Sequence, residues 1–323
     1  MRRLHELFGE RYQPTPLMRN LTTSAIGGPA SGMVIARTND ELVDAIRTAR
    51  ELGVEYLVVG GGSNLLVADE GIGHLIVKNE VVDIRREGNV LVVSGGTVLQ
   101  DLVDYAIQQG LVGMQKLNGI PGTVGGAVYG NAGAYGQTIS DWLVDVLYFD
   151  GENVLALPKS DCHFTYRSSI FKEKRLTVLE SRFHLEAADP QALSAEAEGV
   201  LRQRLVKYPP GLRCSGSFFK NVIAADVAPE SLALIPADKV LYGKIPSGYL
   251  LEQVGAKGRS LGDIWVSTAS ANLFVNLGEG KASDLLQLAS ELALKVYEHY
   301  GIALEPEVQI VGLPSPFSHY SSV

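Results

Sequence analysis

Three consecutive glycines stand directly behind a short apolar run, and a hydroxyl and an amide side chain follow them. The residues of this first glycine loop are Gly60, Gly61, Gly62, Ser63 and Asn64. Glycine has no Cβ, so successive backbone N–H groups in such a loop can converge on one anion. The serine hydroxyl and the asparagine amide add further hydrogen-bond donors. This pattern therefore favours the binding of a phosphate or a diphosphate.

A second glycine loop, NGIPGTVGGAVYGNAGAYG, occupies residues 118–136. Its glycines expose backbone in the same way, and Pro121 stiffens the chain between them. The loop is too rich in glycine for a plain helix or strand, so we expect it to wind across another element. A single glycine triplet is more often a tight turn than a ligand site. Two donor-rich loops in one domain favour a diphosphate attached to a long, flat body.

The first loop does not match the two common phosphate-binding signatures. A P-loop requires GxxxxGK[ST], but Leu65 and Val67 stand where the second glycine belongs. The Rossmann fingerprint GxGxxG also needs a glycine at position 65 and a helix behind it, whereas LLVADEG does not look like a helix start. We therefore expect a nest of backbone N–H groups and not a helix N-terminus.

A β-α-β unit is expected to position the first loop. Its strands are residues 33–36 and 57–59, which are apolar throughout. The helix between them is expected to begin with a capping box formed by Thr38 and Glu41. Its apolar residues then recur on one face, as in an amphipathic helix.

A second helix is expected to begin with Thr97 and Gln100 as its capping box and to end at Gly110. The other expected elements are strands at 75–78, 90–93, 176–185, 264–267, 272–276 and 303–312, a hairpin that turns at Asp150–Gly151, and helices at 191–206, 248–254 and 283–300.

The stretch KYPPG at 207–211 interrupts these patterns, so we expect a domain boundary there. The predicted organisation is an N-terminal segment at 1–19, a first domain at 20–206, a second domain at 207–312 and a mobile tail at 313–323.

The composition bounds the class of protein. The chain has 323 residues, 46% of them hydrophobic, which indicates globular domains with real cores. Its formal net charge of −8 argues against a nucleic acid or an anionic membrane as the main partner. No membrane span, signal peptide, zinc site or disulfide framework is expected from the apolar runs and the two cysteines, so we expect a cytoplasmic protein.

Five stretches in order resemble the UDP-N-acetylenolpyruvoylglucosamine reductase family. They are the two glycine loops, FTYRSSIFK (164–172), GSFFKN (216–221) and LEPEVQIVG (304–312). The resemblance implies an α+β fold in two parts: an FAD-binding domain of the vanillyl-alcohol-oxidase (PCMH) type, itself made of two parts, and a smaller α+β substrate-binding domain. It also resembles the shorter type of these enzymes, which lacks an inserted substrate-capping loop.

The resemblance implies two cofactors, non-covalent FAD and the co-substrate NADPH. The two glycine loops would hold FAD, with the diphosphate against their backbone amides. The FAD-binding residues implied are Gly60, Gly61, Gly62, Ser63, Asn64, Pro121, Gly122, Thr123, Gly125, Gly126, Asn131 and Ala132. We interpret His163 and His184 as structural residues, and no metal is expected.

Three residues match the family's catalytic positions. Arg167 would hold the substrate carboxylate, which gains charge during the reaction. Ser217 would donate a proton to C2 of the enolpyruvyl group, and a relay would have to return that proton. The alternatives are a surface arginine in a loop and a serine bonded to the backbone at a strand start.

Glu307 matches the third catalytic position. Glu305 and Glu307 are expected to share one face of a strand, so their spacing alone does not choose between them. A shared proton or a pairing with Arg167 would explain a carboxylate beside an anionic substrate.

The residues that would contact the UDP-sugar or the nicotinamide nucleotide are Tyr166, Lys207, Lys220 and Asn221, and Lys220 is equally consistent with an ordinary surface lysine. The chain departs from the family pattern at Val222, Ser270 and Leu273.

The resemblance implies reduction of UDP-N-acetylenolpyruvoylglucosamine to UDP-N-acetylmuramate for peptidoglycan synthesis, by a protein expected to be a monomer. The alternatives are another flavin oxidoreductase of this fold, of the sugar or lactone oxidase type, and a flavin-binding scaffold without activity.

Overall fold

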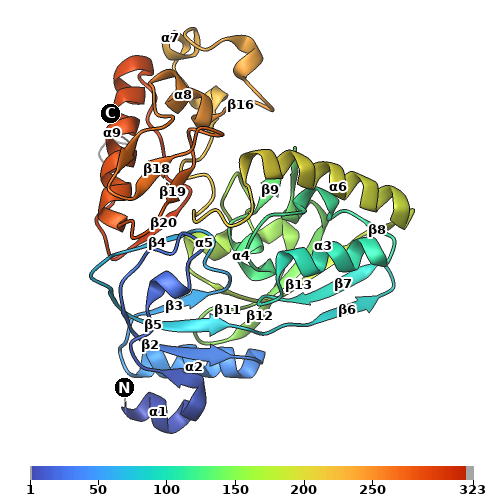
Figure 1. The fold of residues 1–323 in the computed structure, drawn as a ribbon. Helices are drawn as coiled ribbons and strands as arrows, with labels where there is room; N and C mark the ends of the chain where they lie inside the picture. The colour runs from blue at the N-terminus through green and yellow to red at the C-terminus, as the bar shows by residue number, and fades with distance from the viewer. Residues whose placement is uncertain (1, 318–323) are drawn as a thin grey trace. The chain divides into compact units, whose positions relative to one another are not determined.

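The computed structural model describes residues 2–317, which form two compact units (Figure 1). Both units are discontinuous in sequence. Unit 1 consists of residues 2–16, 30–61 and 73–205, and unit 2 of residues 17–29, 62–72 and 206–317. The chain therefore passes from one unit to the other inside the first glycine loop, between Gly61 and Gly62.

Unit 1 contains two main sheets. The first has the strand order β1-β2-β5-β3, in which β3 runs parallel to β5. The second has the order β12-β11-β13-β7-β6 and is antiparallel throughout. The strands are β1 (Tyr12–Gln13), β2 (Ala30–Ala36), β3 (Tyr56–Val59), β5 (Ile72–Asn79), β6 (Ile84–Glu87), β7 (Val90–Ser94), β11 (Leu143–Phe149), β12 (Val154–Pro158) and β13 (Thr177–His184), with the short pairs β8 (Leu111–Val112) with β14 (Glu186–Ala187) and β9 (Gly133–Ala134) with β10 (Gln137–Thr138).

Helices cover these sheets. They are α1 (Arg2–Phe8), α2 (Asn39–Glu51), α3 (Leu99–Gln108), α4 (Val124–Tyr129), α5 (Ile170–Glu173) and α6 (Pro190–Lys207), whose last residues belong to unit 2. Leu42, Ile46 and Ala49 of α2 are fully buried in a core with residues of β2 and β5, as their spacing predicted. Helix α4 packs on β7 and β13 (Figure 1).

The two predicted capping boxes have different outcomes. Thr38 caps α2 by accepting from the Glu41 N–H at 3.2 Å, as predicted, although the Glu41 carboxylate accepts from the Arg37 N–H. The box at Thr97 and Gln100 is wrong, because the N-cap of α3 is Val98. The Thr97 hydroxyl instead bonds to the backbone of Asp83.

The second glycine loop contains a helix that its composition did not predict. Thr123 is the N-cap of α4 and accepts from the Gly126 N–H at 3.4 Å. Val124 and Val128 are fully buried in the core of the second sheet. This packing stabilises a short helix despite the low helix propensity of glycine.

Unit 2 is built around the long helix α9. Its elements are β4 (Leu65–Val67), β15 (Val222–Ile223), β16 (Lys244–Ile245), β17 (Ser260–Leu261), β18 (Ile264–Val266), β19 (Phe274–Asn276), β20 (Gln309–Val311), α7 (Pro229–Leu232), α8 (Ser247–Gln253) and α9 (Ala282–Tyr300). The sheets have the orders β17-β18-β19, β15-β16 and β20-β4. Gly301 ends α9 in the left-handed conformation, at φ 65°, as predicted.

The strand predicted at 303–312 is wrong over most of its length. Only Gln309–Val311 form β20, which pairs in parallel with β4. Residues 303–308 are irregular apart from an isolated bridge between Phe219 and Pro306. The hairpin at Asp150–Gly151 is confirmed, with residues 150–153 joining β11 to β12.

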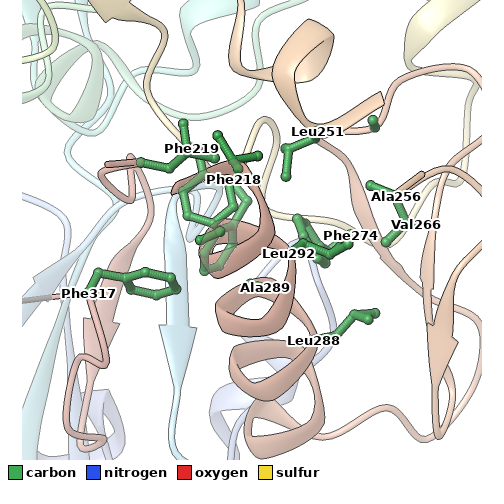
Figure 2. Close-up of a cluster of buried hydrophobic side chains, with 14 of the residues drawn as sticks. Phe218, Phe219, Leu251, Ala256, Val266, Phe274, Leu288, Ala289, Leu292 and Phe317 are labelled. Carbon is green, nitrogen blue, oxygen red and sulfur yellow. The ribbon is translucent and has the colours of Figure 1, made fainter. Parts of the chain in front are cut away.

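The mobile tail predicted from residue 313 lies partly outside the described residues. Within the described part, Phe317 is 4% exposed and packs against Phe218 and Phe219, with ring centroids 6.0 and 5.4 Å away (Figure 2). None of the described helices combines the length and the apolar character needed to span a membrane.

Candidate active site

The two glycine loops touch within unit 1. A Cβ at Gly60 would collide with the side chain of Thr123, and a Cβ at Gly61 would lie 2.8 Å from the Gly122 Cα. Glycine is therefore required at 60 by the Thr123 side chain and at 61 by the close approach of the Gly122 backbone. The structure brings together four residues predicted to bind the cofactor, which lie far apart in the sequence.

The backbone donors of the two loops are used differently. In the second loop, the N–H groups of Val124 and Gly125 bond to the carbonyl oxygens of Thr97 and Gly95, both at 2.8 Å. Within the described chain, no hydrogen bond uses the N–H groups of Gly61 and Gly62. The first loop therefore has backbone N–H groups available for an anion. In the second loop, the N–H groups of Val124 and Gly125 are used within unit 1.

Asn131 adds an acceptor to unit 1. Its side-chain Nδ2 donates to the Thr165 carbonyl at 2.9 Å. Its Oδ1 is buried, and no described residue donates to it. A buried acceptor without a donor is unfavourable, so this atom suits a ligand that carries an O–H or N–H group. Ala132, also predicted to bind cofactor, bonds through its N–H to the Ala127 carbonyl at 2.7 Å.

Arg167 is held in a strained conformation beside Asn131. Its φ of 58° lies in the left-handed region, which a residue with a long side chain adopts only when its surroundings impose it. Its guanidinium donates to the carbonyl oxygen of Gly133 at 2.9 Å and lies 5.4 Å from the centroid of the Tyr166 ring. The arginine is therefore an anchored side chain and not a mobile surface residue.

Lys78 is a residue of this site that the sequence analysis missed. Its ammonium donates to the Gly60 carbonyl, directly at the first glycine loop. Burial lowers the pKa of Lys78, and the nearby Glu80 carboxylate opposes that shift. The one sequence feature that could have indicated Lys78 is its position at the end of an apolar run.

Ser217 and Ser215 have different partners in unit 2. The Ser217 Oγ lies 3.3 Å from the Lys207 Nζ and 3.0 Å from the Tyr208 Oη. The Ser215 hydroxyl donates to the Leu65 carbonyl at 3.1 Å and is 9% exposed. Ser215 is thus the serine bonded to the backbone, and Ser217 presents its hydroxyl to two polar side chains.

Apolar packing and one amide fix the segment that carries Ser217. Phe218 and Phe219 are buried beside Phe274, in one cluster with Leu292 of α9 (Figure 2). The Asn272 side chain accepts from the Phe219 N–H at 2.9 Å and donates to its carbonyl at 2.8 Å. Asn272 was missed in the sequence analysis, because its role depends on a contact between distant segments.

Glu305 and Glu307 do not share a strand face, contrary to the prediction, because this segment is irregular. The Glu305 carboxylate pairs with the Lys220 ammonium. The Glu307 N–H donates to the Phe218 carbonyl at 2.7 Å, which ties the backbone of Glu307 to the residue after Ser217. The structure therefore distinguishes the two glutamates.

Asn64 also contacts this segment of unit 2. Its Nδ2 donates to the Glu307 carbonyl at 3.1 Å, and its own carbonyl accepts from the Gln309 N–H at 3.0 Å. The amide predicted to bind cofactor thus supports Glu307. Asn221 accepts from the Ser247 N–H at 3.3 Å through its side-chain oxygen.

The positions that depart from the family pattern lie in unit 2. Val222 begins β15, and the Ser270 carbonyl accepts from the Leu273 N–H at 3.1 Å in the turn before β19. Leu273 is fully buried.

The described residues contain no group of three or more His, Cys, Asp or Glu arranged to hold a metal ion. Both cysteines are buried, and burial together with nearby carboxylates raises the pKa of Cys162 to about 12. Its thiol stays protonated at neutral pH and is therefore a poor nucleophile.

Comparisons with known proteins cover nearly the whole chain. A family model described as "FAD binding domain" matches residues 30–153, and one described as "UDP-N-acetylenolpyruvoylglucosamine reductase, C-terminal domain" matches residues 208–311. Two curated proteins named UDP-N-acetylenolpyruvoylglucosamine reductase are similar. The protein of Solibacter usitatus is 42% identical over 90% of this chain and 94% of its own length, and that of Rubrobacter xylanophilus is 36% identical over 96% and 98%. The crystal structure of the Thermus caldophilus reductase has a TM-score of 0.73 and 30% identity, over 92% of this chain and 97% of that one.

Proposed function

The chain belongs to the UDP-N-acetylenolpyruvoylglucosamine reductase family, and from this premise we propose which of its residues carry out the reaction. The protein reduces UDP-N-acetylenolpyruvoylglucosamine to UDP-N-acetylmuramate in peptidoglycan synthesis, with FAD as cofactor and NADPH as reductant. Its fold combines an FAD-binding domain of the vanillyl-alcohol-oxidase type with a smaller α+β substrate-binding domain.

The glycine loops fit FAD. No hydrogen bond within the described chain uses the N–H groups of Gly61 and Gly62, which are therefore available for the diphosphate, and the role of Ser63 stands on the resemblance. The buried Oδ1 of Asn131 can accept from an O–H or N–H group of the cofactor. FAD bound there would supply the hydride chemistry, between NADPH and C3 of the enolpyruvyl group. The other predicted cofactor-binding residues stand on the resemblance; they are Gly60, Asn64, Pro121, Gly122, Thr123, Gly125, Gly126 and Ala132.

Arg167 binds the carboxylate of the enolpyruvyl group. Hydride addition at C3 places negative charge on C2 and on this carboxylate, so a guanidinium binds it more strongly as the reaction proceeds. The contacts of the guanidinium with Gly133 and Asn131 orient it before substrate arrives. Pre-orientation matters because a charge held in place needs no reorganisation during the reaction.

Ser217 donates the proton that C2 requires. The observation that supports this role is its hydroxyl, which lies within hydrogen-bonding distance of an ammonium and a phenol. A serine hydroxyl is a weak acid at neutral pH, so neighbouring donors that stabilise its conjugate base are needed for this chemistry. Such general acid catalysis contributes roughly 10²–10⁴-fold.

Glu307 is the catalytic carboxylate near Ser217. This assignment is supported by the bond of the Glu307 N–H to the Phe218 carbonyl and by the Asn64 amide, which donates to the Glu307 carbonyl.

We assign the substrate or nucleotide contacts to Tyr166, Lys207, Lys220 and Asn221. The Lys220 ammonium pairs with the Glu305 carboxylate and the Lys220 side chain is 18% exposed, so its contact with a phosphate stands on the resemblance. We also propose that the protein is a cytoplasmic monomer, which light scattering and cell fractionation would test.

An anaerobic spectrum of the purified protein tests the function. We expect NADPH to bleach the flavin band and UDP-N-acetylenolpyruvoylglucosamine to restore it without oxygen. Recovery only after oxygen is admitted would instead indicate an oxidase of the same fold. A colourless protein that takes up no FAD would contradict the assignment of both glycine loops.

A further inference from the structure

The hydroxyl of Ser217 has two neighbours whose hydrogen-bonding capacities differ. The Lys207 ammonium, 3.3 Å from Oγ, has no lone pair and can only donate. The Tyr208 phenol, 3.0 Å from Oγ, can donate or accept. The Ser217 Oγ itself has one hydrogen and two lone pairs. The direction of the Ser217 hydrogen therefore depends on Tyr208.

Ser217 can give its hydrogen to a substrate carbon only when its O–H does not already donate a hydrogen bond to a neighbouring side chain. Both lone pairs of Oγ must then accept, one from Lys207 and one from Tyr208. In this arrangement the Ser217 O–H bond points away from both donors. If Tyr208 were the acceptor, the hydrogen would point at the phenol and proton transfer to carbon would require its rotation.

We propose that Tyr208 is a positioning residue for this proton transfer: its phenol O–H directs the Ser217 hydroxyl and then returns the proton that Ser217 loses. The inference rests on the proposed role of Ser217 as proton donor. Lys207, the last residue of α6, and its neighbour Tyr208 both belong to unit 2, as does Ser217. The arrangement is thus set within one short stretch of a single unit.

The proton balance closes with water as the final source of the proton. The Ser217 O–H bond breaks as the C2–H bond of the product forms. The Tyr208 O–H bond then breaks as Oγ recovers its hydrogen, and water supplies a proton to the phenolate. The Lys207 Nζ lies 5.1 Å from the centroid of the Tyr208 ring, so its charge stabilises the phenolate while it exists. No electrons are transferred in these steps.

The variant Tyr208→Phe tests the proposal because it removes the hydroxyl and keeps the ring beside Lys207. Anaerobic stopped-flow absorbance separates the two half-reactions. We expect flavin reduction by NADPH within about twofold of the wild type, and flavin reoxidation by UDP-N-acetylenolpyruvoylglucosamine slower by roughly 10–100-fold. The solvent deuterium isotope effect on reoxidation should increase, while the dissociation constant of the substrate, measured by calorimetry, stays within about twofold.

Two further variants make the outcomes distinguishable. Tyr242→Phe is the matched control, because Tyr242 is 80% exposed and should leave both rates unchanged. Ser217→Ala tests the premise. If Ser217→Ala slows reoxidation and Tyr208→Phe does not, the role of Tyr208 is overturned and that of Ser217 stands. Equal slowing of both half-reactions in Tyr208→Phe would also overturn the proposal, since it would indicate a structural effect. Unchanged reoxidation in Ser217→Ala would overturn the assigned role of Ser217 itself.

Discussion

Hydrogen-bond partners separate residues that the sequence presents as near equivalents. Ser215 and Ser217 stand two positions apart, as do Glu305 and Glu307. Ser215 bonds to a backbone carbonyl and Glu305 to a lysine, whereas the Ser217 hydroxyl contacts two side chains and the Glu307 backbone bonds to Phe218. The Ser215 hydroxyl, which already bonds to the backbone, is less available for chemistry than the Ser217 hydroxyl. The two glutamates differ in which segment of unit 2 each one contacts.

At the residue scale, Arg167→Lys should lower the rate of flavin reoxidation by about 10²–10³-fold, because a lysine cannot make the two parallel bonds of a guanidinium to a carboxylate. Stopped-flow measurement of both half-reactions would check this, with flavin reduction by NADPH expected to change little. Arg182→Lys is the control, since Arg182 lies at the surface in ion pairs with Asp145 and Glu87. Equal rates of flavin reoxidation in Arg167→Lys and the wild type would contradict the proposal that Arg167 binds the substrate carboxylate.

Regular elements position the two glycine loops against each other. Strand β3 delivers Gly60 and Gly61, and the turn before α4 delivers Gly122 and Thr123. Burial of α4 on β7 and β13 holds that turn in place. Gly61 and Gly122, which lie far apart in the sequence, approach this closely because neither carries a side chain.

At the element scale, Gly61→Ala should destabilise the protein by about 1–3 kcal/mol and weaken FAD retention, because the added Cβ would lie 2.8 Å from the Gly122 Cα. Thermal unfolding and the ratio of flavin to protein absorbance after purification would measure both effects. Gly73→Ala is the matched control: a Cβ at Gly73 meets no atom within 4 Å, so stability and flavin content should remain those of the wild type. Full FAD retention in Gly61→Ala would show that the contact between the loops does not shape the cofactor site.

At the scale of the whole molecule, neither unit is a continuous stretch of chain. Unit 2 contains β4, which comes from residues 65–67 and pairs in parallel with β20 near the end of the described chain. Leu66 belongs to the same buried cluster as Phe218 and Phe219. The predicted domain limits, 20–206 and 207–312, remain a prediction, and the contribution of residues 17–29 and 62–72 to unit 2 was not foreseen.

A fragment of residues 207–323 should therefore unfold at lower urea concentration and less cooperatively than unit 2 does in the full chain, because it lacks β4 and the amide of Asn64. Circular dichroism during urea titration would measure this. A synthetic peptide of residues 62–72 should partly restore the transition, whereas a scrambled peptide should not. A cooperative transition without the peptide would mean that β4 is dispensable for unit 2.

Ordered motifs in the sequence were enough to identify the family, and that resemblance implied the cofactors and the activity. Apolar periodicity predicted the longer helices and strands, because such patterns are local properties of the chain. Local signals failed where long-range packing decided the structure: α4 formed inside a glycine-rich loop, Val98 replaced Thr97 as a helix cap, and the segment of Glu305 and Glu307 lost its strand. Only the tertiary structure joined Tyr208 to Ser217, Lys78 to Gly60 and Asn272 to Phe219. These contacts depend on where the chain returns in space, which residue spacing does not specify.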